Sequence, residues 1–451
     1  MHGNGLLTTP PPVGPQFAGR RVLVMGLGTH GGGAGAVRYL MRCGAAVTLT
    51  DRRTEDQLAE PLAALGCGPT LRLGGHDPAD FSAANCDLIV ASPAVPFRHE
   101  ILEAARRAGV PVTTELALAA AALPPGVRTA AVTGSNGKTT TCALLHAVLA
   151  AKHARAGGAA WLAGNGGGSL LDEIKRVRPG DSAVWEVSSF QLEHLNPAGF
   201  RCDAAVVTNF AANHLDRHGT IESYRAAKAG LLANLAPADA AILNAADADV
   251  RAWSTAAEHL LFTTRPRPLS GDHNAANSAA AEAAAIRLGC TAADVAAGLS
   301  TAELPPHRLQ LVREAGGVRF IDDSAATTPE SLIAALRATP PPVFLIAGGA
   351  DKGADFAAAA RVSAARAAAA FFIGSTGPAL REAVAAVAPD HPSRYCGVLP
   401  AAFEAATAAA ARAGGGCVLL SPGCASLDQF AGFEARGAAF AALARGYSPA
   451  D

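Results

Sequence analysis

Short apolar runs recur along the chain, and most of them end in glycine, serine or an acidic residue before a stretch of helical spacing. Buried parallel strands are continuous apolar runs of this kind, and helices connect them. The pattern therefore predicts an α/β protein in which parallel sheets alternate with helices. The predicted strands lie within residues 21–28, 45–51, 86–93, 129–132, 183–187, 317–324, 343–348 and 417–422.

The chain of 451 residues is long enough for roughly two to four domains. A second domain is expected to begin near Thr114, and the Pro-Pro-His-Arg sequence at 305–308 is typical of a linker into a third. We expect a loose Pro/Gly-rich lead at 1–18, a Rossmann-like domain at 19–114, a central domain with a phosphate loop at 115–304 and a second Rossmann-like domain at 305–451.

One predicted strand leads into a glycine-containing turn and then a helix. Gly134 and Gly137 let the backbone bend so that its N–H groups face phosphate oxygens, and the helix N-terminus adds its positive end. Lys138 can reach the terminal phosphates, and the Thr139 hydroxyl can bind Mg²⁺. Val132 stands where the longer phosphate-loop pattern has glycine, and the alternative is an ordinary turn with a solvated lysine. The predicted nucleotide-binding residues are Gly134, Ser135, Asn136, Gly137, Lys138, Thr139 and Thr140.

The first predicted strand also leads into glycines, Gly26 and Gly28, and the next strand ends at Asp51. This order is typical of a Rossmann βαβ unit, in which glycines permit close approach to a diphosphate and the acid holds a ribose or base edge. The alternative is a tight turn that packs a helix on a strand. The strand at 86–93 ends in Ser92 and Pro93, at the edge of a parallel sheet where ligands bind.

Two charged residues lie where burial is expected. Glu186 interrupts an apolar strand, and a buried acid is costly unless something compensates its charge. A Mg²⁺ ion beside the phosphate loop would compensate it, and a buried salt bridge is the alternative. Lys228 shares a helical stripe with Tyr224, Leu231 and Leu235. Burial would lower the pKa of the Lys228 amine, and the neutral amine could then add CO₂ to form a carbamate. The alternative is that the aliphatic part of the side chain packs in the core while the ammonium group reaches water.

Composition narrows the class of protein. The formal net charge of −1 argues against a nucleic-acid-binding protein. No run of about 18 uninterrupted apolar residues occurs, so we expect no membrane span. The N-terminal stretch lacks the basic and apolar regions of a signal peptide. The nine cysteines are scattered singly, which is typical of reduced thiols in a cytoplasmic protein. We also expect a monomer.

As a set, these motifs resemble the Mur ligase superfamily, whose members use ATP to add amino acids to the peptidoglycan precursor. The resemblance covers nearly the whole chain after residue 19. It implies three domains, of which the first holds the UDP part of the substrate, the second is the ATPase and the third completes the ATP and amino-acid sites. The segments that carry the resemblance are 134–140, 186–193, 214–218, 224–228, 273–274, 307–308, 323–324 and 420–430.

The closest resemblance within the superfamily implies a ligase that adds D-glutamate to UDP-N-acetylmuramoyl-L-alanine through an acyl phosphate. It also implies ATP, two Mg²⁺ sites and a carbamylated Lys228, with Lys138, His214 and Lys228 as catalytic residues. The implied metal ligands are Thr139, Glu186, His214 and Lys228, and the implied further ATP contacts are Asn274, Arg308 and Asp323. The implied UDP-substrate residues are Gly28, Thr29, His30, Asp51, Arg52, Ser92, Ala94, Asn165 and His214, and the implied glutamate pocket is Thr327, Lys352, Ser426, Leu427 and Phe433.

Three departures from the family pattern leave the amino acid open. Ala325 replaces a lysine that many relatives carry, Asn213 replaces an acid, and Thr29 and His30 differ at the uracil site. The same reaction with L-glutamate is therefore an alternative. A sister Mur or folylpolyglutamate-type ligase is a second alternative, although the folate type usually lacks a full N-terminal UDP domain. A nucleotide-binding module without catalysis is a third, and it would need no second metal site.

Overall fold

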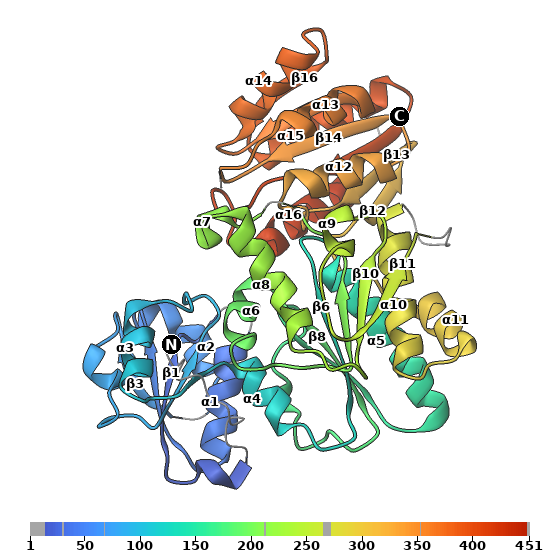
Figure 1. Ribbon diagram of the computed structural model, residues 1–451. Coiled ribbons are helices and arrows are strands. Elements are labelled where there is room, and N and C mark those ends of the chain that lie inside the picture. Colours follow the sequence, from blue (N-terminus) through green and yellow to red (C-terminus); the bar gives the residue numbers. More distant parts are fainter. Residues whose placement is uncertain are drawn as a thin grey trace. The chain divides into compact units, whose positions relative to one another are not determined.

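The computed structural model describes residues 14–28, 31–66, 68–211, 213–264, 272–351 and 353–448. Within them the strands form three sheets, as the alternating pattern predicts (Figure 1). The described residues up to Thr263 and those of Ala276–Glu303 form one compact unit, which holds the first two sheets. Leu304 onward, with the described part of 264–275, forms a second unit around the third sheet.

The first sheet has five parallel strands in the order β3-β2-β1-β4-β5. Phe17 is fully buried against the ring of Tyr39, so the last residues of the expected loose lead pack on this domain. The lead's residues 1–13 lie outside the described part of the chain. The elements are η1 (Gly14–Phe17), β1 (Arg21–Met25), α1 (Gly32–Arg42), β2 (Ala46–Asp51), η2 (Asp56–Leu58), α2 (Ala59–Ala63), β3 (Thr70–Leu73), η3 (Pro78–Phe81), β4 (Leu88–Ala91), α3 (Glu100–Arg107) and β5 (Val112–Thr113).

The second sheet has six parallel strands in the order β11-β10-β9-β6-β8-β7. Strand β6 lies between β9 and β8, so a ligand at its carboxyl end is bordered by the ends of both neighbours. The elements are α4 (Glu115–Ala122), β6 (Arg128–Thr133), α5 (Lys138–Ala156), β7 (Ala160–Gly164), η4 (Leu170–Asp172), β8 (Ser182–Glu186), α6 (Ser189–Leu195), β9 (Ala204–Val207), α7 (Leu215–His218), α8 (Ile221–Ala233), β10 (Ala240–Asn244), α9 (Ala248–Arg251), β11 (Glu258–Phe262), α10 (Asp272–Arg287) and α11 (Ala292–Thr301).

The third sheet has six strands in the order β12-β13-β17-β14-β15-β16. It departs from the predicted parallel sheet at one edge, because β12 and β13 form an antiparallel hairpin. The turn between them contains Gly316 and Gly317, both at positive φ. The elements are β12 (Gln310–Ala315), β13 (Val318–Asp322), α12 (Pro329–Ala338), β14 (Val343–Gly348), α13 (Ala357–Arg366), β15 (Ala367–Ile373), α14 (Gly377–Val387), β16 (Ser393–Gly397), α15 (Leu399–Arg412), β17 (Gly416–Leu420) and α16 (Phe433–Gly446).

Small side chains allow the elements of the cores to approach closely. Strand β9 reads Ala-Ala-Val-Val and is buried throughout. On α11, a Cβ at Gly298 would lie 2.4 Å from the Cα of Val148, so glycine is needed where α11 crosses α5. This packing fixes the helix whose N-terminus follows the phosphate loop. No described helix is long and apolar enough to cross a membrane.

Candidate active site

The predicted phosphate loop joins β6 to α5, as the strand–turn–helix pattern requires. Gly137, at the N-cap of α5, is left-handed with a φ of 81° and has no side-chain cap, so the first N–H groups of the helix can meet an anion. A Cβ at Gly134 would lie 1.9 Å from Thr208 Oγ1, and one at Gly137 would lie 2.4 Å from Asn277 Oδ1. Both glycines are therefore required by close contacts as well as by backbone conformation.

The carboxyl end of the neighbouring strand β9 holds this loop in shape. The N–H of Ser135 donates to the carbonyl of Asn209 at 3.0 Å, and the N–H of Asn136 donates to Asn209 Oδ1 at 2.9 Å. Lys138 folds back over the turn, where its Nζ donates to the carbonyls of Gly134 at 2.9 Å and Ser135 at 3.1 Å. The loop thus positions a cation beside an open helix N-terminus.

Glu186 is buried, as predicted, at the end of β8 beside the start of α5. The Thr139 hydroxyl donates to Glu186 Oε1 at 3.1 Å, and the side-chain amide of Asn165 donates to the same oxygen at 3.3 Å. The ion pairs among the described residues do not include Glu186, which weighs against the buried salt bridge.

The donor set at Thr139 and Glu186 is compatible with Mg²⁺, because this ion is usually held by one or two protein oxygens, substrate phosphates and water. A closed protein cage is not needed. The described residues contain no group of three or more His, Cys, Asp or Glu side chains that could hold a metal.

Lys228 is 1% exposed on the predicted stripe of α8, so its head does not reach water. Its Nζ donates to the Gly134 carbonyl at 2.8 Å and lies 4.8 Å from the centre of the Tyr224 ring. Burial, and then the nearby positive charge of Lys138, hold the pKa of the Lys228 amine well below its usual value. The amine is therefore biased toward the neutral form that can react with CO₂.

His214 belongs to a cluster of rings beside Lys228. Its ring centre lies 4.9 Å from that of Phe190 and 6.2 Å from that of Tyr224. The Tyr224 hydroxyl in turn lies 3.1 Å from Ser135 Oγ, which links the cluster to the phosphate loop. His214 has a φ of 55°, a left-handed conformation that is costly for a residue with a Cβ and often marks a functional site.

A cavity of about 300 Å³ lies in the first unit, between the glycine turn after β1 and the ends of β4, β7 and β8. Four of the predicted UDP-substrate residues line it, namely Gly28, Ser92, Ala94 and Asn165. Thr29 and His30 lie outside the described residues. A cavity of this size, with apolar walls and a few polar groups, is typical of a ligand site.

Asp51 and Arg52 lie beside the glycine turn but do not line this cavity. Both oxygens of the Asp51 carboxylate already have partners: Leu27 N–H donates to Oδ2 at 3.0 Å, and the Arg53 N–H donates to Oδ1 at 2.9 Å. The Arg53 guanidinium forms an ion pair with the same carboxylate at 3.0 Å. In this arrangement Asp51 shapes the turn, and Arg52 is exposed.

Glu115 also lines the cavity, and the sequence analysis missed it. It is half-buried at the start of α4, and the Ser169 hydroxyl donates to its Oε1 at 2.5 Å. Burial raises the pKa of Glu115 to about 7. A Cβ on Gly32, in the first turn of α1, would lie 3.6 Å from Glu115 Oε2. Gly32 and Glu115 are 83 positions apart in the sequence, so no local pattern reveals that they lie close together.

The remaining predicted site residues belong to the second unit. Asp323 is buried, accepts hydrogen bonds from the Ser421 hydroxyl at 2.8 Å and the Leu309 N–H at 3.2 Å, and has a pKa raised by burial to about 7. Arg308 is half-buried nearby, and its charge opposes that rise in pKa. Lys352 and the side chain of Asn274 lie outside what the structure describes.

The described glutamate-pocket residues are close in sequence to groups that hold a buried arginine of α16 or are held by them. Arg436 donates to the carbonyls of Ser324, Cys424 and Ala425. The Ser324 hydroxyl donates to the carbonyl of Phe433 at 2.8 Å. Next to these groups, Ser426 is buried, Thr327 and Phe433 are half-buried, and Leu427 is 68% exposed.

Comparison with known proteins agrees with this layout. Residues 20–114 match the MurD-like N-terminal domain of Mur ligases, residues 132–267 match the Mur ligase middle domain, and residues 307–424 match the Mur ligase glutamate ligase domain. Among solved structures, the UDP-N-acetylmuramate-alanine ligase of Thermotoga maritima has the same fold, with a TM-score of 0.56 and 19% identity over 89% of this chain and 95% of that one.

Full-length relatives are more similar. The UDP-N-acetylmuramoylalanine–D-glutamate ligase of Anaeromyxobacter dehalogenans is 40% identical, over 95% of this chain and 98% of its own. The protein of the same name from Roseiflexus is 38% identical, over 96% of this chain and 100% of its own. The chain therefore belongs to the Mur ligase family.

Proposed function

We propose that the chain is an ATP-dependent ligase that joins D-glutamate to UDP-N-acetylmuramoyl-L-alanine in peptidoglycan precursor synthesis. The relatives that match it over their whole length carry this activity in their names. The observation that carries the proposal is the convergence of Lys138 and Lys228 on the Gly134 carbonyl, beside an uncapped helix N-terminus. The Lys138 ammonium and the positive end of α5 at such a turn suit a substrate with several phosphates.

The reaction has two steps. An oxygen of the acceptor's terminal carboxylate attacks the γ-phosphorus of ATP, the bond to ADP breaks, and an acyl phosphate forms. The amine of glutamate, after losing a proton, attacks the acyl carbon, and phosphate leaves with the transferred carboxylate oxygen. Two anions meet in the first step, so charge neutralisation by Lys138 and the N–H groups of α5 lowers its barrier.

Metal ions belong to this proposal. Thr139 and Glu186 would hold one Mg²⁺ ion, and His214 with a carbamate on Lys228 would hold another. When bound, Mg²⁺ reduces the repulsion between carboxylate and phosphate. The low pKa of the Lys228 amine supports carbamate formation, because only the neutral amine adds CO₂.

The acceptor and glutamate sites remain proposals. The acceptor would occupy the cavity between Gly28, Ser92 and Asn165, and glutamate would bind beside Ser426 and Phe433. The match of 20–114 to a MurD-like N-terminal domain favours this acceptor over a folate. Because Ala325 replaces a common lysine, L-glutamate stays an alternative donor. A cytoplasmic location, the monomeric state and the three domain boundaries stay predictions.

The test is phosphate release with ATP, Mg²⁺ and UDP-N-acetylmuramoyl-L-alanine, run with D-glutamate, with L-glutamate and with neither. Release that depends on D-glutamate is expected. Release only with L-glutamate would move the selectivity question to the surroundings of Ala325. Intact ATP binding without release in any mixture would overturn the proposal and favour a sister ligase or a binding module.

A further inference from the structure

The loop after β4, residues 92–97, is held by helices that follow strands of the second sheet. The guanidinium of Arg217, on α7, donates to three consecutive carbonyls of this loop. Its Nη1 lies 2.6 Å from the Ala94 oxygen, and its Nη2 lies 3.2 Å from those of Pro93 and Val95. One side chain thus binds the backbone of a segment that is 122 to 124 residues away in the sequence.

Arg217 is itself held on both sides. Its Nη2 pairs with Glu193 Oε2 at 2.8 Å, and its guanidinium carbon lies 4.7 Å from the centre of the Phe190 ring. Burial alone would raise the pKa of Glu193, but hydrogen bonds from His218 and Arg217 outweigh it and lower the value to about 2. Glu193 is therefore ionised, and the planar fork of Arg217 is fixed between an acid and a ring.

A second contact fixes the far end of the same loop. Nε2 of His194, on α6, lies 2.9 Å from the Val95 carbonyl, and its ring meets that of Phe97 edge-on at 5.5 Å. Burial lowers the pKa of His194 to about 4, so near neutral pH the ring is uncharged and donates through Nε2. The guanidinium of Arg106 lies over the ring of Phe97, 4.0 Å from its centre. Arg106 also donates to the Phe97 carbonyl at 2.7 Å.

The groups that Arg217 holds form two walls of the cavity. Pro93 and Ala94 line one wall and Phe190 lines another, whereas Arg217 is not among the lining residues. Phe190 also contacts the ring of His214, at 4.9 Å. Arg217 therefore touches the outside of both walls and connects them to the turn that carries His214.

We propose that Arg217 is a positioning residue that aligns the acceptor's carboxylate end, by fixing the 92–97 loop to Phe190 and to the His214 turn. This inference rests on the proposed function, in which the cavity holds the acceptor. In-line attack on the γ-phosphorus needs the carboxylate placed accurately, and a misplacement of about 1 Å can cost roughly 100-fold in rate. Arginine suits the task because its donors reach three carbonyls and one carboxylate at once.

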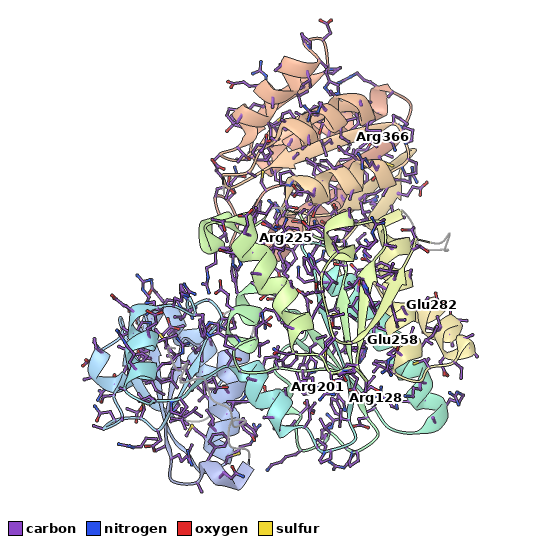
Figure 2. All side chains as sticks on the ribbon, in the orientation of Figure 1. Arg128, Arg201, Arg225, Glu258, Glu282 and Arg366 are labelled. Carbon is purple, nitrogen blue, oxygen red and sulfur yellow. The ribbon has the colours of Figure 1, made fainter. Side chains whose placement is uncertain are left out.

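The experiment compares Arg217→Ala and Arg217→Lys with Arg225→Ala. Arg225, labelled on α8 in Figure 2, is a matched control, because it also pairs with an acid (Asp249, 2.6 Å) and lies over a ring (Phe210, 5.1 Å) but makes no contact with the 92–97 loop. Kinetics are measured with acceptor, ATP and glutamate varied separately, acceptor binding is measured by calorimetry, and thermal unfolding checks the fold.

For Arg217→Ala, kcat/KM for the acceptor should fall roughly 100-fold while KM for ATP stays within about twofold. Arg217→Lys, which keeps the positive charge, should lose roughly 10-fold in kcat/KM for the acceptor, and added guanidinium should partly restore Arg217→Ala. Arg225→Ala should keep wild-type values. Unchanged acceptor kinetics in both Arg217 variants, or an equal rise in KM for ATP, would overturn the inference alone. A wild-type protein that does not bind the acceptor would overturn the proposed function and this inference with it.

Discussion

The first unit has the same backbone conformation in two turns, the one before α1 and the one before α5. In each, a left-handed glycine with a φ of 81° precedes the helix, Gly31 in one and Gly137 in the other. Neither helix has a side-chain hydrogen bond at its N-cap. Both turns therefore offer backbone N–H groups to a ligand.

The charged groups around the two turns differ in sign. The Lys138 ammonium donates to the turn before α5, whereas the Asp51 carboxylate accepts from the turn before α1 and Glu115 lies near Gly32 in the first turn of α1. The cationic turn suits a highly charged triphosphate. The acidic turn has one of its N–H groups already occupied, so it suits a ligand with hydroxyl or amide donors as well as phosphate. The glycines determine the backbone conformation of each turn. The charged residues that bind each turn, some of them distant in the sequence, determine which kind of ligand it suits.

Removing the Lys138 cation should have the largest effect. Lys138→Ala should lower turnover roughly 10²- to 10³-fold, because a preorganised charge beside the developing negative charge is lost. Steady-state phosphate release measures it. Lys152→Ala is the control, since Lys152 lies on the same helix and donates to the Leu288 carbonyl away from the turn. Near-normal turnover of Lys138→Ala would contradict the assignment of the phosphate loop.

Removing the amine that would carry the carbamate should cost somewhat less and be partly reversible. Lys228→Ala should lower turnover roughly 10²-fold, and a short-chain carboxylate should restore part of it by replacing the carbamate. The same carboxylate should not restore Lys138→Ala. Full activity of Lys228→Ala, or equal restoration of both variants, would rule out the carbamate.

A larger side chain in the turn before α1 should raise KM for the acceptor and leave KM for ATP unchanged. A Cβ at Gly33 would lie 2.4 Å from the Leu27 carbonyl and 2.5 Å from that of Gly26, so Gly33→Ala must shift the turn. We expect KM for the acceptor to rise about 10-fold and stability to fall by about 1–3 kcal/mol, as overpacking typically does. Gly75→Ala, where a Cβ would meet nothing within 4 Å, is the control. A rise in KM for ATP instead would mean that the two turns are not independent.

The smallest effect concerns Glu115 and is a change of stability with pH. Its pKa is raised from 4.5 to about 7 in the folded chain, so the folded state binds this proton more tightly than the unfolded state does. The stabilisation is complete below about pH 4.5 and is lost as the pH rises through 7. Asp172, which is paired with Arg38, adds to the rise in pKa.

Between pH 5 and pH 8, wild type should lose about 1–3 kcal/mol relative to Glu115→Gln, measured by chemical unfolding at each pH. Glu103→Gln, on the exposed face of α3, is the control. Its free energy of unfolding should change between pH 5 and pH 8 by the same amount as that of wild type. A pH dependence that is the same in wild type and Glu115→Gln would show that Glu115 does not titrate in this range.

Local patterns predicted much of the fold and part of the geometry of the candidate site. The strand–turn–helix at Gly134–Lys138 and the buried stripe with Lys228 follow from spacings within one element, and the structure has both. Buried Glu186 followed from its place in an apolar strand. These features depend on residues that are neighbours in the sequence, which is why periodicity reveals them.

The rest depends on contacts between distant segments. Glu115 with Ser169, and Arg217 with the Ala94 carbonyl, join residues 54 and 123 positions apart. Nothing in the spacing around these residues signals their partners. The antiparallel strand β12 was missed because its residues, Gln-Leu-Val-Arg-Glu-Ala, are at most half-buried and form no continuous apolar run.

The most direct test follows an oxygen atom. The acceptor is prepared with oxygen-18 in its terminal carboxylate and is turned over with ATP, Mg²⁺ and D-glutamate, and the released phosphate is analysed by mass spectrometry. An acyl phosphate requires that each phosphate carries one oxygen atom from the acceptor's carboxylate, so labelled phosphate should appear in step with product. Amide product accompanied by unlabelled phosphate would contradict attack of the carboxylate on ATP, and with it the role assigned to the cationic turn.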